Sequence, residues 1–188
     1  MSDSWEIKKI GVVTLDIFSG GTPDTSRKEY WGGSIPWLSS GETKNSFILE
    51  TEKKITKPGV TNSTTKLALK EDVLIASAGQ GHTRGQVSFC MIDTYINQSI
   101  VALRANKTLI EPCIFFHNLK SRYNELRKIS DSHSSRGSLT TKLLANLRIQ
   151  VPPLAEQRCE LLHVLDAKIV LNKRMNYTIE QLAETIFV

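Results

Sequence analysis

Two short segments of the sequence together match an acid–acid–lysine pattern that some nucleases use. Pro23-Asp24 is followed downstream by Glu52-Lys53-Lys54, and the two segments read as PD…ExK. In such enzymes the carboxylates bind Mg²⁺ and the site orients the attacking water. Asp24, however, stands in a stretch rich in glycine and threonine, which is typical of a turn. We therefore keep a Mg²⁺-dependent endonuclease that uses Asp24, Glu52 and Lys54 as the alternative hypothesis.

No other motif in the sequence predicts catalysis. The segments GQGHTRG (79–85) and SSRGSLTTK (134–142) match neither of the two common glycine-rich phosphate loops. The chain has no GxSxG segment for a serine nucleophile and no NPPY-like motif for methylating exocyclic amines. Its four histidines lack the spacing of metal ligands. The sequence therefore predicts no catalytic residue and no bound metal.

Polar and basic side chains that could contact DNA are frequent in the segments expected to be loops. Arginine and lysine can pair with guanine in the major groove, and glutamine can pair with adenine. Other basic and hydroxyl side chains can hold phosphates and set the register of the protein on the duplex. Each such residue could instead be an ordinary solvated loop residue. As a group, the candidate DNA-binding residues are Arg27, Lys28, Lys44, Gln80, His82, Arg84, Gln86, Ser135, Arg136 and Lys142.

Positive charge is concentrated in the first part of the chain. The net charge of the whole chain is +5, with 24 basic and 19 acidic residues. Residues 151–188 hold four basic and five acidic residues, which leaves 20 basic and 14 acidic residues in residues 1–150. The basic excess is densest between Lys120 and Arg148. An uneven positive charge of this kind favours a polyanionic partner such as DNA.

The elements that would position these residues belong to a mixed α+β domain. Short β-branched runs at 8–15, 72–79, 86–92 and 99–105 predict strands of a twisted mixed sheet, separated by polar loops at 19–33, 39–46 and 79–85. From Pro112 the apolar residues recur every three or four positions, which predicts an amphipathic helix. Ser138 is expected to cap a short helix that precedes a last strand at 147–151. We assign residues 1–151 to this domain.

Residues 152–188 are expected to form one long helix. Pro153 suits a first helical turn, and no glycine or proline follows it, so the helix could extend about 50 Å. An apolar seam with two asparagines predicts a coiled coil whose register the asparagines determine. A helix lying on its own domain is the alternative. The seam residues are Leu161, Leu165, Ile169, Asn172, Asn176, Ile179, Leu182 and Ile186.

The chain shows no sign of membrane insertion or secretion. No run of about 18 apolar residues is present. The first residues, MSDSWEIKK, lack the apolar stretch of a secretory signal. We expect a cytoplasmic location.

The order of several segments resembles the specificity subunit of type I restriction–modification systems. The first half matches through SGGTP (19–23), YWGGSIPWLSSGE (30–42) and ITKPGV (55–60). The second half matches through GHTRGQV (81–87), INQSIVAL (96–103) and LANLRIQVPPLAEQR (144–158). These segments extend over nearly the whole chain, and PPLAEQ before a long helix is the most specific of them.

The resemblance implies a non-catalytic subunit in which a target recognition domain reads DNA and a conserved helix acts as a spacer. Members of the family usually carry two such domains and two antiparallel helices. Their partners are methyltransferase subunits that bind S-adenosylmethionine and flip an adenine out of the duplex. For cleavage, the resemblance also implies ATP-dependent motor–nuclease subunits that use ATP and Mg²⁺.

This sequence holds one recognition domain and one helix, so the resemblance implies a half-length form or a fragment. A half-length form would restore the usual geometry as a homodimer with antiparallel helices, and would then read a palindromic split target. A scaffold that binds the partner subunits without reading DNA is a further hypothesis.

Overall fold

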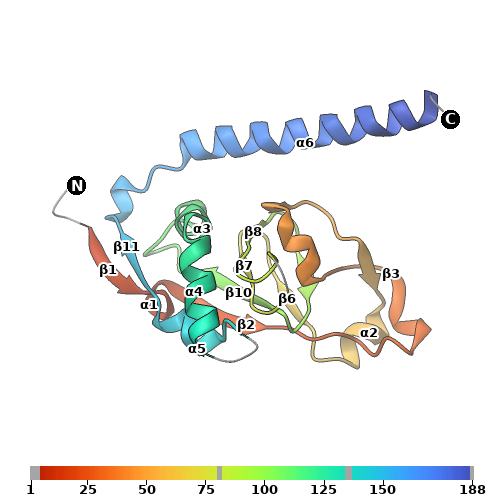
Figure 1. Cartoon of the computed structure of the whole chain (residues 1–188), viewed down its shortest axis with the longest axis horizontal. Helices are drawn as coiled ribbons and strands as arrows, with labels where there is room; N and C mark the ends of the chain where they lie inside the picture. The colour runs from red at the N-terminus through yellow and green to blue at the C-terminus, as the bar shows by residue number, and fades with distance from the viewer. Residues whose placement is uncertain (1–4, 80–81, 134–136, 187–188) are drawn as a thin grey trace. The chain divides into compact units, whose positions relative to one another are not determined.

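The computed structural model describes residues 5–79, 82–133 and 137–186, and it separates into two compact units, Met1–Gln157 and Arg158–Val188. The boundary lies later in the chain than the predicted one between residues 151 and 152. Each unit is described by itself below. The first unit is the predicted mixed α+β domain, and the second contains the predicted long helix (Figure 1).

A five-stranded sheet forms the centre of the first unit. Its strand order is β2-β10-β7-β8-β4, and all neighbours are antiparallel except the parallel pair β4–β8. Every residue of β7 is buried, as expected for a central strand covered on both faces. Three of the four predicted strands lie here. The strands are β2 (Thr14–Ser19), β4 (Phe47–Ile48), β7 (Val73–Ala76), β8 (Val87–Cys90) and β10 (Ile100–Ala105).

A second, four-stranded sheet has the order β5-β3-β9-β6, with β3 and β9 parallel. Buried residues from both sheets, among them Leu38, Leu74 and Ile96, form one continuous apolar core. Figure 1 shows β3 and the short helix α2 (Lys57–Thr61) at one end of the unit. The opposite end holds β1 (Glu6–Lys9), α1 (Ile10–Val13), α5 (Thr141–Asn146) and β11 (Arg148–Val151). The strands are β3 (Trp31–Leu38), β5 (Lys53–Ile55), β6 (Lys66–Ala68) and β9 (Thr94–Ile96).

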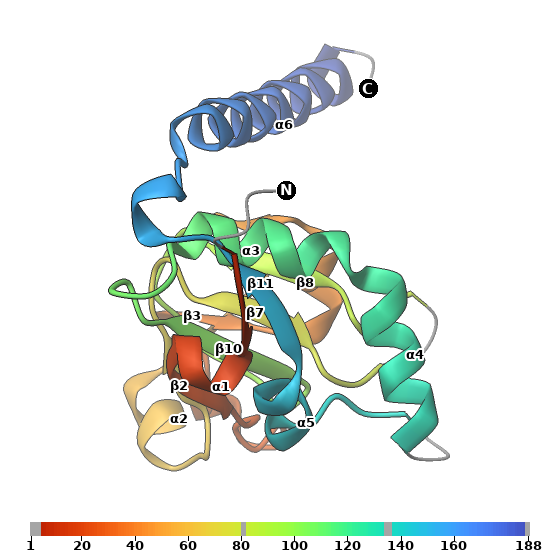
Figure 2. The ribbon, with the colours of Figure 1, turned by 90° about the vertical axis from the view of Figure 1, so that its left-hand side faces the viewer.

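The prediction of one strand over residues 8–15 is wrong. The segment divides into β1 (Glu6–Lys9), the helical turn α1 (Ile10–Val13) and the start of β2. Ile10 and Val13 are fully buried, and the Ile10 N–H donates to the carbonyl oxygen of Leu147 at 2.9 Å. Figure 2 shows β1 beside β11 (Arg148–Val151), with which it pairs antiparallel, and α1 beside α5 (Thr141–Asn146). This distant packing turns the chain where local alternation predicted a straight strand.

The short helix before β11 is present, but its predicted cap is wrong. Thr140 rather than Ser138 is the N-cap, and its hydroxyl accepts a hydrogen bond from the Leu143 N–H at 3.2 Å. The hydroxyl of either residue could have satisfied the free N–H groups at a helix start. The local signal therefore could not distinguish the two positions.

The predicted amphipathic helix is confirmed as two consecutive helices, α3 (Pro112–Ser121) and α4 (Tyr123–His133). Phe115, Leu119 and Leu126 of the predicted apolar stripe are all fully buried. The first helix packs on β7 and β8, and Figure 2 shows both helices at one side of the sheet. Lys120 of α3 and Arg127 of α4 thereby lie close to the connection between β7 and β8.

The long helix does not begin at Pro153 as predicted. Residues Leu154–Glu156 form a 3₁₀ turn, η3, and the helix α6 extends over Glu160–Ile186. Gln157 lies between them, is 6% exposed, and belongs to the first unit. Its amide oxygen accepts from the Glu111 N–H at 2.7 Å, which holds this part of the chain on the first unit.

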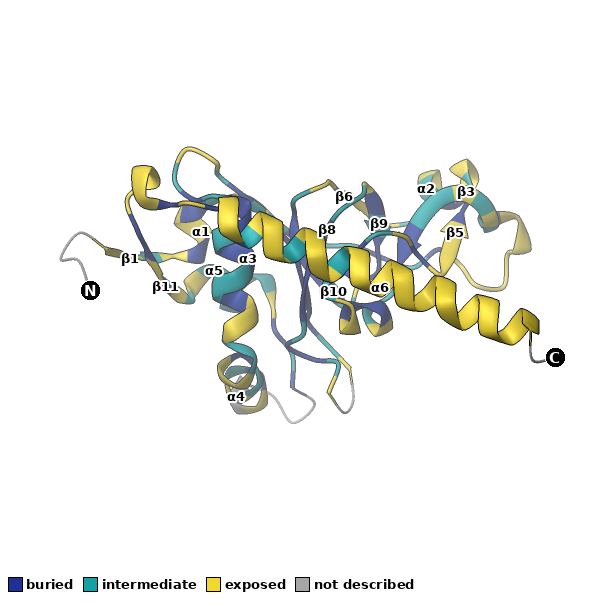
Figure 3. Cartoon of the chain, turned by 90° about the horizontal axis from the view of Figure 1, so that it is seen from above, coloured by how far each residue is buried: buried dark blue, intermediate teal, exposed yellow. Residues whose placement is uncertain are grey.

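The second unit contains α6, and most of the large apolar side chains of this helix are exposed. Figure 3 shows most of the helix as exposed. All six apolar residues of the predicted seam are exposed, from 45% for Ile169 to 71% for Ile186. Among the described helices, α6 included, we find none with the length and apolar character needed to span a bilayer.

Candidate nucleic-acid interface

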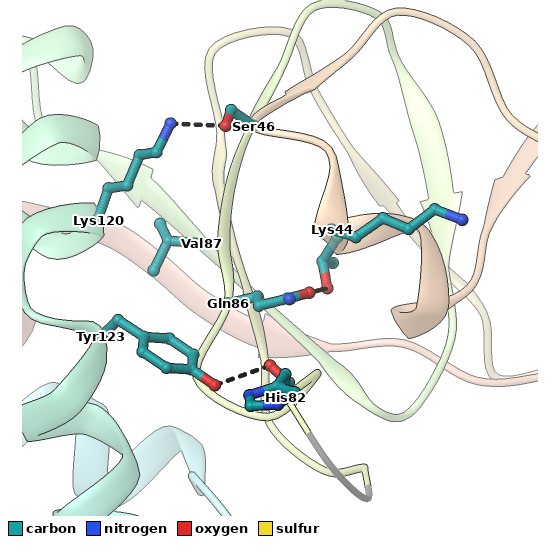
Figure 4. Close-up of a pocket in the computed structure, with 8 residues that line it drawn as sticks. Lys44, Ser46, His82, Gln86, Val87, Lys120 and Tyr123 are labelled. Atoms are coloured by element: carbon teal, nitrogen blue, oxygen red, sulfur yellow. Dashed lines mark hydrogen bonds between the residues drawn. The ribbon is translucent and has the colours of Figure 1, made fainter.

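A hollow of about 370 Å³ brings together three of the predicted DNA-binding residues, Lys44, His82 and Gln86. They come from two segments far apart in the sequence, the 3₁₀ turn η2 (Ser40–Lys44) and the connection between β7 and β8. Helices α3 and α4 supply the opposite wall. Figure 4 shows His82 and Gln86 beside the hollow and the ammonium group of Lys44 directed away from the other side chains. The lining residues are Thr43, Lys44, Ser46, His82, Gln86, Val87, Lys120 and Tyr123.

The turn η2, which forms one side of the hollow, is held in place by hydrogen bonds to its backbone. Ser39 and Glu42 form a capping box, in which the Ser39 N–H donates to the Glu42 carboxylate at 3.0 Å. The second carboxylate oxygen of Glu42 accepts from the Glu52 N–H at 2.8 Å. On the other side of the turn, the Ser88 hydroxyl bonds to the carbonyl oxygens of Thr43 and Asn45. The predicted loop 39–46 is therefore a built element, because a buried carboxylate and a buried hydroxyl satisfy its backbone groups.

Gln86 has hydrogen-bonding capacity left for a ligand. Its amide oxygen accepts a long hydrogen bond of 3.4 Å from the Thr43 hydroxyl. Among the described residues, its amide nitrogen has no partner, so two donors remain for a group in the hollow. A base edge in the major groove offers acceptors of the kind this amide can meet.

His82 is held by its backbone and leaves its ring exposed. The Tyr123 hydroxyl at the start of α4 donates to the His82 carbonyl oxygen at 2.9 Å, as Figure 4 shows. The imidazole is exposed at the rim. Its main chain is thus held by the protein while its side chain is exposed, which suits contact with a partner.

Lys120 lines the hollow and was not among the predicted site residues. Its ammonium group lies 2.6 Å from the Ser46 hydroxyl and 5.2 Å from the centre of the Phe116 ring. The ring stabilises the charge by a cation–π interaction while leaving it at the surface. The dense basic segment that begins at Lys120 was the only signal in the sequence that could have indicated it.

Arg84 was predicted to contact DNA, and the structure directs it inward instead. It is 9% exposed, and its guanidinium group donates to the Gly137 carbonyl oxygen at 3.2 Å and to the Asp131 carboxylate. A guanidinium group with these partners is not available to read a base edge. Arg84 therefore belongs to the support of the loop rather than to its surface.

The remaining predicted residues lie away from the hollow or outside the described residues. Arg27 pairs with Glu29 at 3.4 Å, next to Lys28 in the turn η1 (Lys28–Tyr30), which packs against α2. Lys142 is exposed on α5, which packs against α1. These three basic residues are exposed and do not line the hollow. Gln80, Ser135 and Arg136 are outside the described residues.

The three residues of the nuclease alternative do not form a metal site. The Asp24 carboxylate accepts from both the N–H and the hydroxyl of Ser26, at 2.9 and 2.7 Å, and these bonds lower the pKa of Asp24. The carboxylate thus closes its own exposed turn. Glu52 and Lys54 are exposed as well. Within the described part of Met1–Gln157 taken by itself, no three metal-binding side chains converge.

The chain thus combines a mixed α+β unit, which carries a hollow lined by polar and basic side chains, with a long helix whose large apolar side chains are mostly exposed. The model of the type I restriction modification DNA specificity domain matches residues 2–181. The chain belongs to this family. Membership gives no support to the nuclease alternative.

Individual relatives agree with this assignment. The chain is 25% identical over 188 residues to the type I restriction enzyme MjaIX specificity subunit of Methanocaldococcus jannaschii, covering 97% of this chain and 43% of that protein. It is 28% identical over 152 residues to the EcoR124I/EcoR124II specificity subunit of Escherichia coli, covering 79% and 37%. The chain therefore spans about two fifths of the length of these relatives.

The fold has a close counterpart among solved structures. A type I restriction–modification S subunit from M. genitalium superposes with a TM-score of 0.73 at 18% identity, covering 97% of this chain and 44% of that one. This similarity supports the fold class, including the mixed sheets and the long C-terminal helix.

Proposed function

We propose that this chain is a sequence-specific DNA-reading part of a type I restriction–modification specificity subunit. The first unit reads one half of a split target, and α6 acts as the spacer and association helix. The observation that carries the proposal is the hollow in which Lys44, His82 and Gln86 gather with Lys120. In a chain of this family, such a cluster fits the surface that meets base edges.

The chemistry divides into base reading and backbone positioning. The amide nitrogen of Gln86 can donate to an adenine or guanine acceptor, and the ring of His82 can donate or accept at the rim. Lys44 and Lys120 can neutralise phosphates at the two sides of the hollow, and the exposed Lys142 can do so elsewhere. Base contacts set the sequence, and phosphate contacts set the register and much of the affinity.

The partners follow from the proposed role. The chain catalyses nothing itself and positions adenine methyltransferase subunits on DNA in the cytoplasm. S-adenosylmethionine binds to those subunits, and ATP and Mg²⁺ would bind to motor–nuclease subunits where these join.

The exposed seam of α6 supports association with a second helix, because 45–71% exposure of six large apolar residues is unfavourable in water. We propose an antiparallel homodimer through α6, which would place two reading units on a palindromic split target.

The test is selection of bound duplexes from a random-sequence library by the full chain, with Gln86→Ala and His82→Ala in parallel. We expect the wild-type chain to enrich one motif. Each variant should lose preference at one or two base pairs, by about 1–3 kcal/mol of discrimination. Gln150→Ala, an exposed glutamine on β11, is the matched control and should keep the motif. A wild-type chain that enriches no motif contradicts the proposal.

A further inference from the structure

In the connection between β7 and β8, the described residues 77–79 and 82–86 take a conformation that is held by contacts with other elements. Gly79 has φ +137° and Gly85 has φ +86°, conformations that favour glycine. Near its end the Gln86 N–H bonds to the Thr83 carbonyl oxygen and the Gly85 N–H to that of Ala76. These bonds fix the end of the loop next to β8. The orientation of the loop is then determined by its contacts with other elements.

One face of α4 supplies those contacts at regular spacing. Tyr123, Arg127 and Asp131 are four residues apart, so they lie in one row along the helix. The Tyr123 hydroxyl donates to the His82 carbonyl oxygen at 2.9 Å, and the Arg127 guanidinium donates to the Arg84 carbonyl oxygen at 3.4 Å. Asp131 accepts from the Arg84 side chain. Three successive helical turns therefore hold one loop.

The segment after α4 completes the support. The Arg84 guanidinium donates to the Gly137 carbonyl oxygen, and the Leu139 N–H donates to the Ser77 carbonyl oxygen at 2.9 Å. Gly137 has φ +61°, a left-handed backbone conformation that favours glycine, and the Arg84 guanidinium lies close to its Cα. The backbone conformation at this position therefore favours glycine.

From this arrangement we infer that Arg84 and the α4 row are positioning residues for sequence readout. They hold the loop so that His82 and Gln86 face the hollow, and they determine discrimination between DNA sequences without touching a base. The inference rests on the proposed function of the hollow. A preorganised loop loses less conformational entropy on binding the correct sequence, and the groups it presents stay aligned with base edges.

The test compares Asp131→Asn in the full chain with Asn124→Ala, an exposed control on α4. Two measurements are made on each chain. The first is hydrogen exchange of the backbone amides of residues 82–86 without DNA. The second compares the affinity for the duplex selected by the wild-type chain with the affinity for a random-sequence duplex at equal salt. Removing the charge-assisted hydrogen bond between Arg84 and Asp131 should speed exchange about tenfold and lower discrimination about tenfold. Binding to the random duplex should change less than twofold, and Asp131→Glu should restore discrimination.

The outcomes separate the two proposals. Faster exchange with unchanged discrimination, or unchanged exchange, overturns the positioning role while leaving the hollow as the reading surface. An equal loss on both duplexes also overturns it, because that result indicates a general defect in DNA binding. If the wild-type chain selects no sequence, the proposed function fails, and the exchange data alone then report on the support of the loop.

Discussion

At the scale of single residues, Gln157 shows why the PPLAEQ segment ends in glutamine. Its amide oxygen accepts from the Glu111 N–H, and its amide nitrogen donates to the carbonyl oxygens of Leu109 and Pro152 at 3.0 and 2.8 Å. One buried side chain thus joins two segments that are distant in the sequence. Glutamate or methionine of similar size could not supply both the acceptor and the donors.

We expect Gln157→Ala to lower the free energy of unfolding of the full chain by about 2 kcal/mol, since buried backbone groups lose their partners. Chemical denaturation followed by circular dichroism measures the change. Gln150→Ala on the exposed face of β11 is the control, with an expected effect within about 0.5 kcal/mol. Equal effects at the two positions would show that the three hydrogen bonds do not stabilise the first unit.

At the scale of elements, the four central residues of the α6 seam are arranged symmetrically about residue 174. Asn172 and Asn176 are equally distant from residue 174, and so are Ile169 and Ile179. In an antiparallel pair with its two-fold axis at residue 174, asparagine therefore faces asparagine and isoleucine faces isoleucine. A shift by one heptad would place each asparagine against an apolar residue, which is unfavourable in a buried seam.

This register predicts a specific cross-linking result. An Ile169→Cys chain mixed with a differently tagged Ile179→Cys chain should link through a short thiol-to-thiol reagent, because the two positions face each other in the antiparallel pair. Either variant alone should link far less. Denaturing gels without reductant report the product, and the wild-type chain controls for its native cysteines. A parallel pair would give the opposite pattern, with each variant linking to itself.

At the scale of the whole molecule, the positive charge and the proposed dimer contact lie in different parts of the chain. Residues 1–150 carry the positive excess, and residues 151–188 have one more acidic than basic residue. The large exposed apolar residues of α6 lie in the second part. DNA affinity should therefore depend on the first unit, and oligomeric state on the second.

A chain ending at Gln157 tests this division. Light scattering should show a dimer for residues 1–188 and a monomer for residues 1–157, because the apolar seam is removed. The shortened chain should still bind random duplex DNA, with an affinity that falls as salt rises, since phosphate neutralisation releases counterions. A dimeric short chain, or a monomeric full chain, would contradict the assignment of association to α6.

Local patterns in the sequence were sufficient to predict the helices and strands that are determined by neighbouring residues. The alternation in 72–79, 86–92 and 99–105 predicted β7, β8 and β10, and the period of the last segment predicted α6. The same reasoning failed at residues 8–15 and at Pro153. There the backbone follows distant partners. The partner of residues 8–15 is the Leu147 carbonyl oxygen, and the segment after Pro153 is held by the backbone of Leu109 and Glu111, to which the Gln157 amide bonds.

The residues of the candidate site divide in the same way. Sequence alone determined the basic body, the residue types of the polar loops and the resemblance that identified the family. Tertiary structure alone decided that Lys44, His82 and Gln86 share one hollow with Lys120, and that Arg84 turns inward. The reason is that a side chain's orientation depends on partners brought close by folding. For Arg84 the partner is Asp131, 47 residues away, and no local pattern encodes a contact across that separation.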